Sequence, residues 1–507
     1  MTAVAAPERT VAGDDTRGLA RIAWRIVLPI AVGKIVFQFA TSALYGAHRD
    51  EFYYLAGGHH LAWGYVDHPP LVPWIYRLGE TVFGHSIPAL HVFPALIGGA
   101  VVVLGALLAR ELGGRRRAQV LAATVAAFGP LYGTTSHFLS TVTLDIVFWA
   151  LASLFVVRIV RTGDVRWWLA VGVVCGAGLL NKHTMAFWIM GAVVGLLATP
   201  QRRLLANRWA GAAVAIALVM FLPNVVWQAT HHWATLEFLR NLRRNNAGSD
   251  LPQFLPLQLG MVSLAGTLVW LAALRRAWSD RAFAQWRWLA VGYVVLLVVL
   301  FAAAGKAYYL GSWYLPLVAA GAVVIERRWT ERAWRVMTGA VVVTGLVTLP
   351  LFTPLLPVRT VTALGIDNVN KDIGGMLGWH DVVDQIAARF HALPRPEQAH
   401  ATILTEDYSE AGAVDFWHSS ARLPEAISGH NSYWWWGYGR AGDGPVLAVG
   451  VDRSVLSRYW GSVVQVGTLQ STDARPIDPQ ERGVAMYVCR DQRVPWSVIW
   501  PRLRHYD

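Results

Sequence analysis

The segment LHVFPALIGGAVVVLGALLAR, residues 90–110, contains no Asp, Glu, Lys or Arg before its terminal arginine. About 20 predominantly apolar residues form a helix long enough to cross the hydrocarbon core of a bilayer. This segment therefore predicts a transmembrane helix. Further apolar runs flank it on both sides, at 25–45, 118–137, 142–160, 167–181, 184–200, 209–230, 257–274, 288–304, 308–325 and 334–352. Together they predict a polytopic α-helical membrane protein with about eleven transmembrane helices.

The composition of the 507-residue chain agrees with many membrane spans. Hydrophobic residues make up 55% and charged residues 15%, and the mean hydropathy is +0.38. Soluble globular domains carry about 25% charged residues. With only 2 cysteines and 24 prolines in so apolar a chain, intrinsic disorder, collagen-like repeats and a disulfide scaffold are excluded. The net charge of +12 indicates basic cytoplasmic loops rather than a nucleic-acid partner.

The distribution of basic residues predicts the orientation in the membrane. The N-terminal segment and every second loop between predicted spans hold 22 arginines, whereas the opposite loops before residue 352 hold seven basic residues. Loops rich in Lys and Arg stay in the cytoplasm. We therefore expect a disordered cytoplasmic tail at 1–20, followed by a transmembrane domain at 21–356. An odd number of spans places everything after it outside the cell membrane.

The last part of the chain, residues 357–507, has the pattern of a soluble domain. Short apolar runs such as HATILTED, GPVLAVGVD, VVQVGTL and GVAMYVC are each suited to a β-strand. The stretch YSEAGAVDFW after the first of them is suited to a short helix. We expect a C-terminal extracytoplasmic α/β domain.

Ionisable residues gather on the predicted outer face. The first outer loop, residues 45–89, contains Asp50, Glu51, Asp67 and His68 among many aromatic residues. By itself this loop could be an interfacial helix with ordinary polar decoration, since Tyr and Trp rings anchor at the membrane surface.

Three further polar positions fall on the same face. Asp145 begins one span, Lys182 joins two others, and Lys306 precedes a span together with Tyr308 and Tyr309. Each lysine alone could be a snorkelling helix-end anchor, but ionisable groups at the edge of the hydrocarbon are costly and tend to be functional. A carboxylate could accept a proton from a hydroxyl nucleophile, and cations could hold a lipid-anchored phosphate leaving group. This chemistry is that of a transferase with a lipid-phosphate-linked donor.

Five segments in order resemble a known family: DEFYYLAGGHHLAWGYVDHPPLVPW, the TLD at 143–145, NKHTMAF at 181–187, FLPNVVWQATHHWATLEF at 221–238 and GKAYYLGSWYLPLVAAGA at 305–322. They are similar to the bacterial branch of the protein O-mannosyltransferase and aminoarabinose transferase superfamily. The resemblance implies an integral membrane glycosyltransferase of the GT-C fold that uses polyprenyl-phosphate sugars. It covers essentially the whole membrane region.

The resemblance also implies roles for individual residues. Asp50, with Glu51 beside it, matches the family's catalytic acid, and Asp145 matches the second acid of the site. Lys182, Lys306, Tyr308 and Tyr309 match the donor-phosphate side. His68 stands where some relatives have Lys, which leaves the donor sugar open. The family commonly needs no metal, so we expect none, although the acids at 50, 67 and 145 leave a divalent ion possible.

The expected function is therefore an inverting transfer of one sugar from a polyprenyl-phosphate donor to an acceptor hydroxyl at the outer face of the cell membrane. The expected partners are this donor and membrane lipid, and the acceptor could be protein, lipid, glycan or metabolite. One alternative is a lipid-linked-sugar transporter or flippase without covalent chemistry, which should have ionisable residues at mid-bilayer and inverted repeats. Another is a scaffolding protein that acts through its C-terminal domain.

Overall fold

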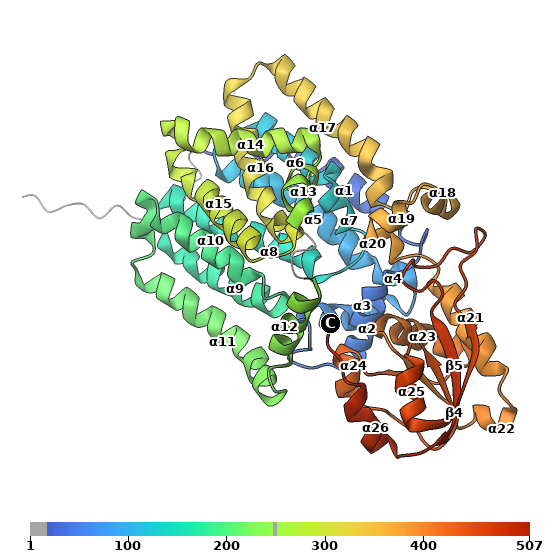
Figure 1. Cartoon of the computed structure of the whole chain (residues 1–507). Helices are drawn as coiled ribbons and strands as arrows, with labels where there is room; N and C mark the ends of the chain where they lie inside the picture. The colour runs from blue at the N-terminus through green and yellow to red at the C-terminus, as the bar shows by residue number, and fades with distance from the viewer. Residues whose placement is uncertain (1–17, 247–250) are drawn as a thin grey trace, which may run out of the picture.

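The structure is a computed structural model that describes residues 18–246 and 251–507, so most of the tail predicted at 1–20 lies outside the described residues. Figure 1 shows a helical body from α1 to α17 and a smaller domain of strands and helices toward the C-terminal end. The helices of the body are α1 (Trp24–Thr41), α2 (Arg49–His59), α3 (Leu71–Phe83), α4 (Ile87–Leu90), α5 (Val92–Glu111), α6 (Arg116–Phe128), α7 (Pro130–Thr134), α8 (Thr141–Thr162), α9 (Trp168–Asn181), α10 (Met185–Leu197), α11 (Arg208–Thr230), α12 (Ala234–Asn246), α13 (Leu251–Gly260), α14 (Leu264–Ser279), α15 (Arg287–Ala302), α16 (Tyr314–Arg328) and α17 (Glu331–Phe352). Short 3-10 helices lie between them, namely η1 (Val165–Trp167), η2 (Pro200–Leu204), η3 (Arg281–Trp286) and η4 (Ala307–Trp313).

Fewer full-length spans are present than the sequence predicts. Among the described residues, seven helical segments are long and apolar enough to cross a membrane, or eight if one bent pair counts as a span. They are Trp24–Thr41, Ile87–Glu111, Thr141–Thr162, Arg208–Thr230, Phe283–Ala302, Ala307–Arg328 and Glu331–Phe352, and the bent pair is α13 with α14. The structure therefore contains fewer helices that meet this length and composition criterion than the eleven transmembrane helices expected from the sequence.

Local breaks in the chain account for the difference. The run at 118–137 is interrupted at Pro130, which lacks an N–H, and the preceding Gly129 is extended as proline requires. The run at 257–274 bends by 92° between α13 and α14, where Ser263 has a φ of 70°. The runs at 167–181 and 184–200 form apolar helices of only 10–17 residues.

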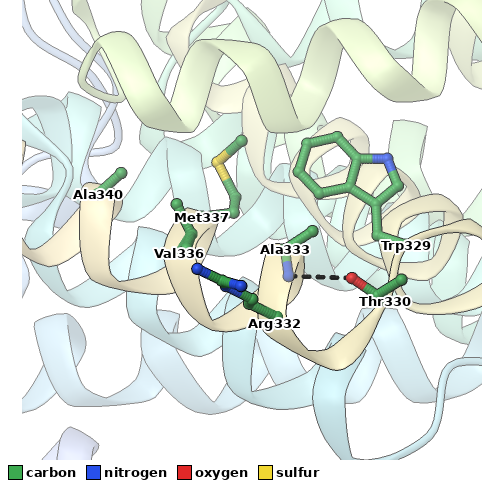
Figure 2. Close-up of a pocket in the computed structure, with 7 residues that line it drawn as sticks. All are labelled: Trp329, Thr330, Arg332, Ala333, Val336, Met337 and Ala340. Carbon is green, nitrogen blue, oxygen red and sulfur yellow. Dashed lines mark hydrogen bonds between the residues drawn. The ribbon is translucent and has the colours of Figure 1, made fainter.

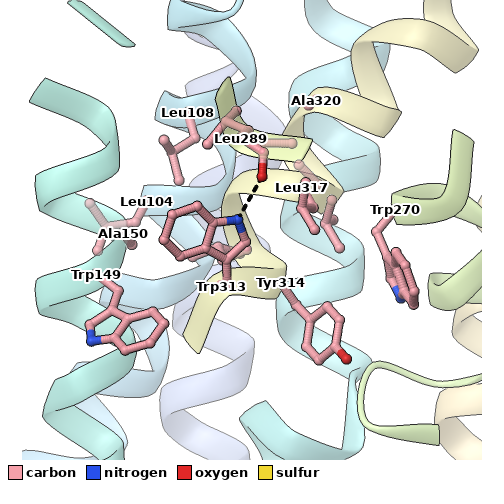
Figure 3. Packing of buried hydrophobic residues seen from close by; sticks show 14 of the residues in the cluster. Leu104, Leu108, Trp149, Ala150, Trp270, Leu289, Trp313, Tyr314, Leu317 and Ala320 are labelled. Atoms are coloured by element: carbon pink, nitrogen blue, oxygen red, sulfur yellow. Dashed lines mark hydrogen bonds between the residues drawn. The ribbon is translucent and has the colours of Figure 1, made fainter. Parts of the chain in front are cut away.

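The centre of the helical body is the segment Ala307–Arg328, which comprises η4 and α16. Of its most apolar window, 89% is buried, against 17% for α11 and for α17, which lie at the periphery. Figure 3 shows Trp313 of this segment packed among Trp149, Tyr314, Leu104 and neighbouring aliphatic side chains. Its indole donates a hydrogen bond of 3.0 Å to the carbonyl of Leu289. The segment that begins just after Lys306 is thus held on all sides by other helices.

The C-terminal domain is built on one mixed five-stranded sheet. Its strands are β1 (Thr402–Thr405), β2 (Ala426–Ser428), β3 (Val446–Val449), β4 (Trp460–Thr468) and β5 (Ala485–Gln492), and its helices are α18 (Val358–Ala363), α19 (Ile366–Val369), α20 (Lys371–Gly374), α21 (Trp379–His391), α22 (Arg395–Gln398), α23 (Tyr408–Ala421), α24 (Asn431–Trp436), α25 (Arg453–Tyr459) and α26 (Trp496–Leu503). The strand order is β2-β1-β3-β5-β4. The first three strands run parallel, whereas β5 pairs antiparallel with both β3 and β4.

The four strands and the helix predicted from the sequence are all present, and β2 is the strand that the prediction missed. In β1, Ile403 and Leu404 point to opposite faces because side chains alternate along a strand. Ile403 packs in the cluster that contains α21 and α23, and Leu404 packs in the cluster that contains α25 and α26. The sheet is therefore covered by helices on both faces.

The α21–α23 face of the sheet also joins the C-terminal domain to the helical body. Phe52 of α2 packs against Trp379, Phe416 and Trp417, with ring centroids 5.3–5.9 Å apart. These residues belong to one hydrophobic cluster that runs from α2 and α3 into the sheet. The two parts of the chain therefore share a core.

Close approach of α2 and α23 depends on Gly412. A Cβ atom at this position would lie 2.8 Å from the Cβ and 2.9 Å from the carbonyl carbon of Phe52. We predict that Gly412→Ala destabilises the protein by about 1–3 kcal/mol, because backbone must shift to admit the methyl group. The measurement is thermal unfolding of the detergent-solubilised protein. Gly442→Ala is the control, since a Cβ there meets no atom within 4 Å. Equal melting temperatures for the two variants would contradict the prediction.

Candidate active site

The first turn of α2 separates the two adjacent acids, Asp50 and Glu51. His48 caps the helix by accepting a hydrogen bond from the backbone N–H of Asp50, while Glu51 accepts one of 2.8 Å from the N–H of His48. Negative side chains are favourable here because the helix N-terminus carries partial positive charge. Since residues advance by about 100° along a helix, Asp50 and Glu51 point in different directions.

Glu51 points into the protein and is fully buried. One carboxylate oxygen accepts from the Tyr76 hydroxyl at 2.8 Å, and the other lies 2.9 Å from Nε2 of His91. A buried carboxylate needs partners of this kind because its desolvation is costly. Glu51 is thus enclosed in hydrogen bonds within the protein.

Asp50 points toward the C-terminal domain, and its side chain is 33% exposed. The hydroxyl of Tyr408, the first residue of α23, donates a hydrogen bond of 3.0 Å to its Oδ1. Burial and the negative charge of Asp50 raise the pKa of Tyr408 well above its ordinary value, so the hydroxyl keeps its proton and remains a donor. The neighbouring Arg49 pairs with Asp478 of the same domain at 3.6 Å.

The loop after α2 places His68 beside the same helix. His68 is buried among the rings of Tyr53, Tyr54 and Tyr65, at centroid distances of 4.8–5.5 Å. Its Nδ1 lies 2.9 Å from the carbonyl of Pro69. Asp67 accepts a hydrogen bond of 2.7 Å from the Tyr53 hydroxyl. His68 therefore packs directly against Tyr53 and Tyr54 of α2, the helix that carries Asp50.

Lys182 and the two tyrosines predicted with it are brought together although they lie about 125 residues apart in the chain. The ammonium of Lys182, just after α9, lies 5.1 Å from the ring centroid of Tyr308 and 5.3 Å from that of Tyr309. Aromatic faces attract cations at this distance. η4 carries both rings at the start of the most buried segment of the body.

Asp145 lies in the first turn of α8 and is buried. Its Oδ2 accepts a hydrogen bond of 2.7 Å from Thr184, while Oδ1 accepts none from the residues that the structure describes. Thr184 is two residues from Lys182, and the charges of Lys182 and Asp145 act on one another. Asp145 is therefore placed to balance the positive charge of Lys182.

Asp372 of α20 links the two groups of residues. Its side chain is exposed, and partial loss of hydration beside the neighbouring protein groups raises the pKa of its carboxyl. The charge of His48 lowers this pKa and the negative charge of Asp50 raises it. The positive charges of Arg49 and Lys306 lower it as well. Asp372 thus lies between the Asp50 side and the Lys306 side of one polar region.

The structure therefore gathers most of the sequence-predicted residues at one end of the helical body. Asp50, Asp145, Lys182 and Lys306 lie there with the tyrosine pair and His68, whereas Glu51 faces away into the protein. Sequence reasoning missed Tyr408 and Asp372, which come from the C-terminal region. Tyr408 opens the stretch YSEAGAVDFW, whose pattern predicts a helix but does not connect Tyr408 to Asp50.

Two hollows on the protein surface lie away from the candidate site residues. One, of about 380 Å³, runs along the start of α17, and Figure 2 shows its lining by Trp329, Thr330, Arg332, Ala333, Val336, Met337 and Ala340. The other, of about 300 Å³, lies where the segment before α2 meets the C-terminal domain, beside Trp379 and Arg475. The predicted site residues line neither hollow.

Several known proteins are similar to this chain in sequence or in fold. Residues 67–227 match the dolichyl-phosphate-mannose-protein mannosyltransferase family. A lipid A galacturonosyltransferase, RgtD of Rhizobium johnstonii, is 27% identical over 283 residues, which cover 54% of this chain and 59% of that protein. An undecaprenyl phosphate-alpha-4-amino-4-deoxy-L-arabinose arabinosyl transferase of Pseudomonas fluorescens is 31% identical over 263 residues, which cover 48% and 46%. The matched region spans about half the length of these curated relatives.

The fold is similar over a larger part of the chain. The crystal structure of ArnT from Cupriavidus metallidurans bound to undecaprenyl phosphate has a TM-score of 0.61 at 14% sequence identity, and covers 92% of this chain and 98% of that one. The apo structure of the same protein has a TM-score of 0.60 at 17% identity. Because these alignments cover nearly the whole chain, the C-terminal domain belongs to the shared fold.

The different surroundings of the two adjacent acids can be tested by stability. We predict that Glu51→Gln lowers the free energy of unfolding by about 1–3 kcal/mol, because the new amide cannot accept from all three donors and leaves a buried polar group unpaired. Asp50→Asn should change it little, since Asp50 is partly exposed and Asn can still accept from Tyr408. Thermal unfolding of both variants provides the measurement. A larger loss for Asp50→Asn than for Glu51→Gln would contradict this assignment.

Proposed function

We propose that the chain belongs to the GT-C superfamily of membrane glycosyltransferases and that it transfers a single sugar from a polyprenyl-phosphate donor to an acceptor hydroxyl. The observation that carries this proposal is the position of Lys182. Its ammonium is held against two tyrosine rings, beside a buried carboxylate and at the same end of the body as Asp50. A cation and a partly exposed carboxylate at one site match the needs of a phosphate leaving group and a hydroxyl nucleophile.

In the proposed reaction, Asp50 accepts the proton of the acceptor hydroxyl. The acceptor oxygen then bonds to the anomeric carbon of the sugar from the side opposite the lipid phosphate. The bond from that carbon to the phosphate oxygen breaks, and the phosphate leaves with the electron pair. One displacement of this kind inverts the configuration at the anomeric carbon. Lys182 and Lys306 stabilise the leaving phosphate, and this chemistry uses no metal ion.

Other residues of the region would support these roles. Asp145 would hold Lys182 in place, and the rings of Tyr308 and Tyr309 would exclude water from its ammonium. The ring of His68 packs against Tyr54, so His68 would act on the sugar or phosphate by positioning Tyr54. Glu51 would position α2 rather than touch the reacting atoms, because its oxygens already accept from protein donors.

The sugar and the acceptor are open, since two of the relatives are named for different sugars. The experiment that tests the proposed function is a transfer assay in membranes with a panel of radiolabelled polyprenyl-phosphate sugars. The panel contains galacturonosyl, aminoarabinosyl and mannosyl donors. Release of one label from the lipid to a second molecule is the expected result. Movement of an intact lipid-linked label across the bilayer, with no release, would instead identify a flippase.

For the general base, we predict that Asp50→Asn lowers the rate of transfer by about 10²–10⁴-fold, because an amide cannot accept the proton. The rate is measured with the labelled donor that the panel identifies. Tyr408→Phe is the matched positioning variant and should leave a reduced but measurable rate. Near-normal turnover of Asp50→Asn would place the base elsewhere.

For the donor phosphate, we predict that Lys182→Ala strongly weakens donor use and that Lys182→Arg restores it only in part. A compact ammonium lies beside the edge-to-face pair of Tyr308 and Tyr309, whereas a planar guanidinium presents a different geometry. Transfer is measured over a range of donor concentrations for the three proteins. If Lys182 were a snorkelling anchor, Arg would serve as well as Lys. Full activity of Lys182→Arg, together with normal donor affinity of Lys182→Ala, would contradict the phosphate role.

For the topology, we propose eleven crossings, with the N-terminus in the cytoplasm and residues 357–507 outside. The short helices α9 and α10 would then cross as a closely packed pair, and the site would lie at the outer face. We predict that a reporter fused after residue 360 is active only outside the cytoplasm. The arginine-rich loops are expected to stay in the cytoplasm, and residue 360 follows a span whose other end adjoins such a loop. Reporter activity confined to the cytoplasm would reverse the orientation.

A further inference from the structure

The last residues of the chain meet two loops of the C-terminal sheet in a cluster of imidazoles and carboxylates. His430 follows β2, and His505 and Asp507 follow α26. One ligand-type atom from each of the three lies within 4.8 Å of the others. Nε2 of His430 is 2.9 Å from Oδ1 of Asp507, and the two imidazole rings stack with centroids 4.7 Å apart.

The cluster extends to the end of β1. Glu406 Oε1 lies 3.8 Å from Nε2 of His505, and its side chain is 51% exposed and able to turn. His430, His505 and Asp507 thus offer two imidazoles and one carboxylate, and the carboxylate of Glu406 lies beside them. Imidazole nitrogen and carboxylate oxygen are ligands that Zn²⁺ takes in a tetrahedral arrangement, at about 2.0–2.2 Å.

Groups behind the cluster orient its ring nitrogens. Nδ1 of His505 lies 2.9 Å from the carbonyl of Leu503, and a carbonyl can only accept. Nδ1 therefore carries the proton, and Nε2 keeps a free electron pair for a ligand bond. Nδ1 of His430 accepts a hydrogen bond of 3.3 Å from the backbone N–H of Tyr408 and lies 3.5 Å from Oδ2 of Asp407. Metal binding at Nε2 would place the ring proton on Nδ1, where the Asp407 carboxylate could accept it. A carboxylate or carbonyl behind an imidazole is the arrangement that orients histidines toward a metal.

From this arrangement we propose that His430, His505 and Asp507 bind a divalent transition metal of the Zn²⁺ class, with Glu406 as the fourth ligand. The site is separate from the acids and lysines assigned to sugar transfer. It would join the chain end to the loop that opens α23. The ring of His430 lies 4.8 Å from the ring of Tyr408, which donates to Asp50. The bound metal would therefore hold in place the loop that completes the surroundings of Asp50.

Metal binding is tested on the full-length protein in detergent, first stripped with a chelator and then titrated with Zn²⁺ against a chromophoric competitor. We expect one Zn²⁺ per chain, with a higher melting temperature when loaded. His505→Asn and Asp507→Asn should each weaken the affinity at least 10-fold, since loss of even an outer partner costs about 10–100-fold. Both side chains are partly exposed, so these variants preserve the buried His430.

Matched variants make the outcome specific. His380→Asn removes an exposed histidine that pairs with Asp384 at 3.3 Å outside the cluster, and it should bind Zn²⁺ as the parent does. Asp407→Asn keeps an oxygen for the N–H of Ser409 at the start of α23 and should weaken the affinity about 10–100-fold. The melting temperature of each metal-free variant, compared with that of the metal-free parent, reports any loss of folding.

Two results would overturn the proposal. In the first, the stripped parent takes up no Zn²⁺, which would make the cluster an ion-pair network of His430 with Asp407 and Asp507. In the second, His505→Asn and Asp507→Asn bind Zn²⁺ as tightly as the parent, which would assign the ion to another group. The exposed group His59–Glu80–His85, with contacts of 2.7 and 2.8 Å, is the first to examine. Neither result depends on sugar transfer.

Discussion

The buried carboxylate of Glu51 is the interaction on which the candidate site depends. It joins the start of α2 to Tyr76 of α3 and to His91 at the start of α5, in a region where an unpaired charge would be strongly unfavourable. These partners set both the position and the rotation of α2. Because Glu51 is held inward, Asp50 must face outward, toward the C-terminal domain. The adjacent acids therefore have different surroundings, and one of them provides the geometry in which the other can act.

The C-terminal domain is part of the site rather than an appendage. Phe52 shares a hydrophobic core with α21 and α23, and Gly412 lets the two backbones approach. This contact brings Tyr408 within hydrogen-bonding distance of Asp50, across 358 positions of sequence. Arg49 and Asp478 make a second link at the same boundary. A carboxylate on the helical body is thus oriented by a hydroxyl from the sheet domain, which limits how the two parts can move without changing the site.

The cations of the site lie beside the most buried part of the helical body. Tyr308 and Tyr309 lie on η4, which continues into the central helix α16, and the ammonium of Lys182 lies 5.1 and 5.3 Å from their ring centroids. Groups carried on well-packed elements are held more precisely than groups on loops. The chain uses Arg for 40 of its 44 basic residues, and two of its four lysines, Lys182 and Lys306, belong to the candidate site. Lysine at these positions agrees with a demand for a compact charge beside aromatic rings.

The sequence by itself determined the helical membrane body, four of the five strands, and the set of polar residues that meet at one end, because periodicity and residue type are local properties. Even the inward role of Glu51 had a local signal, since it stands three residues after the helix-capping position. The number of full-length spans could not be predicted from local composition. Breaks at Pro130 and Ser263 divide apolar runs that composition alone counts as single spans. The positions of Tyr408 and Asp372 depend on the tertiary structure. Tyr408 contacts Asp50 because α2 packs against the C-terminal domain, and the charges of Asp372 and Asp50 act on one another. No spacing within either segment encodes this arrangement.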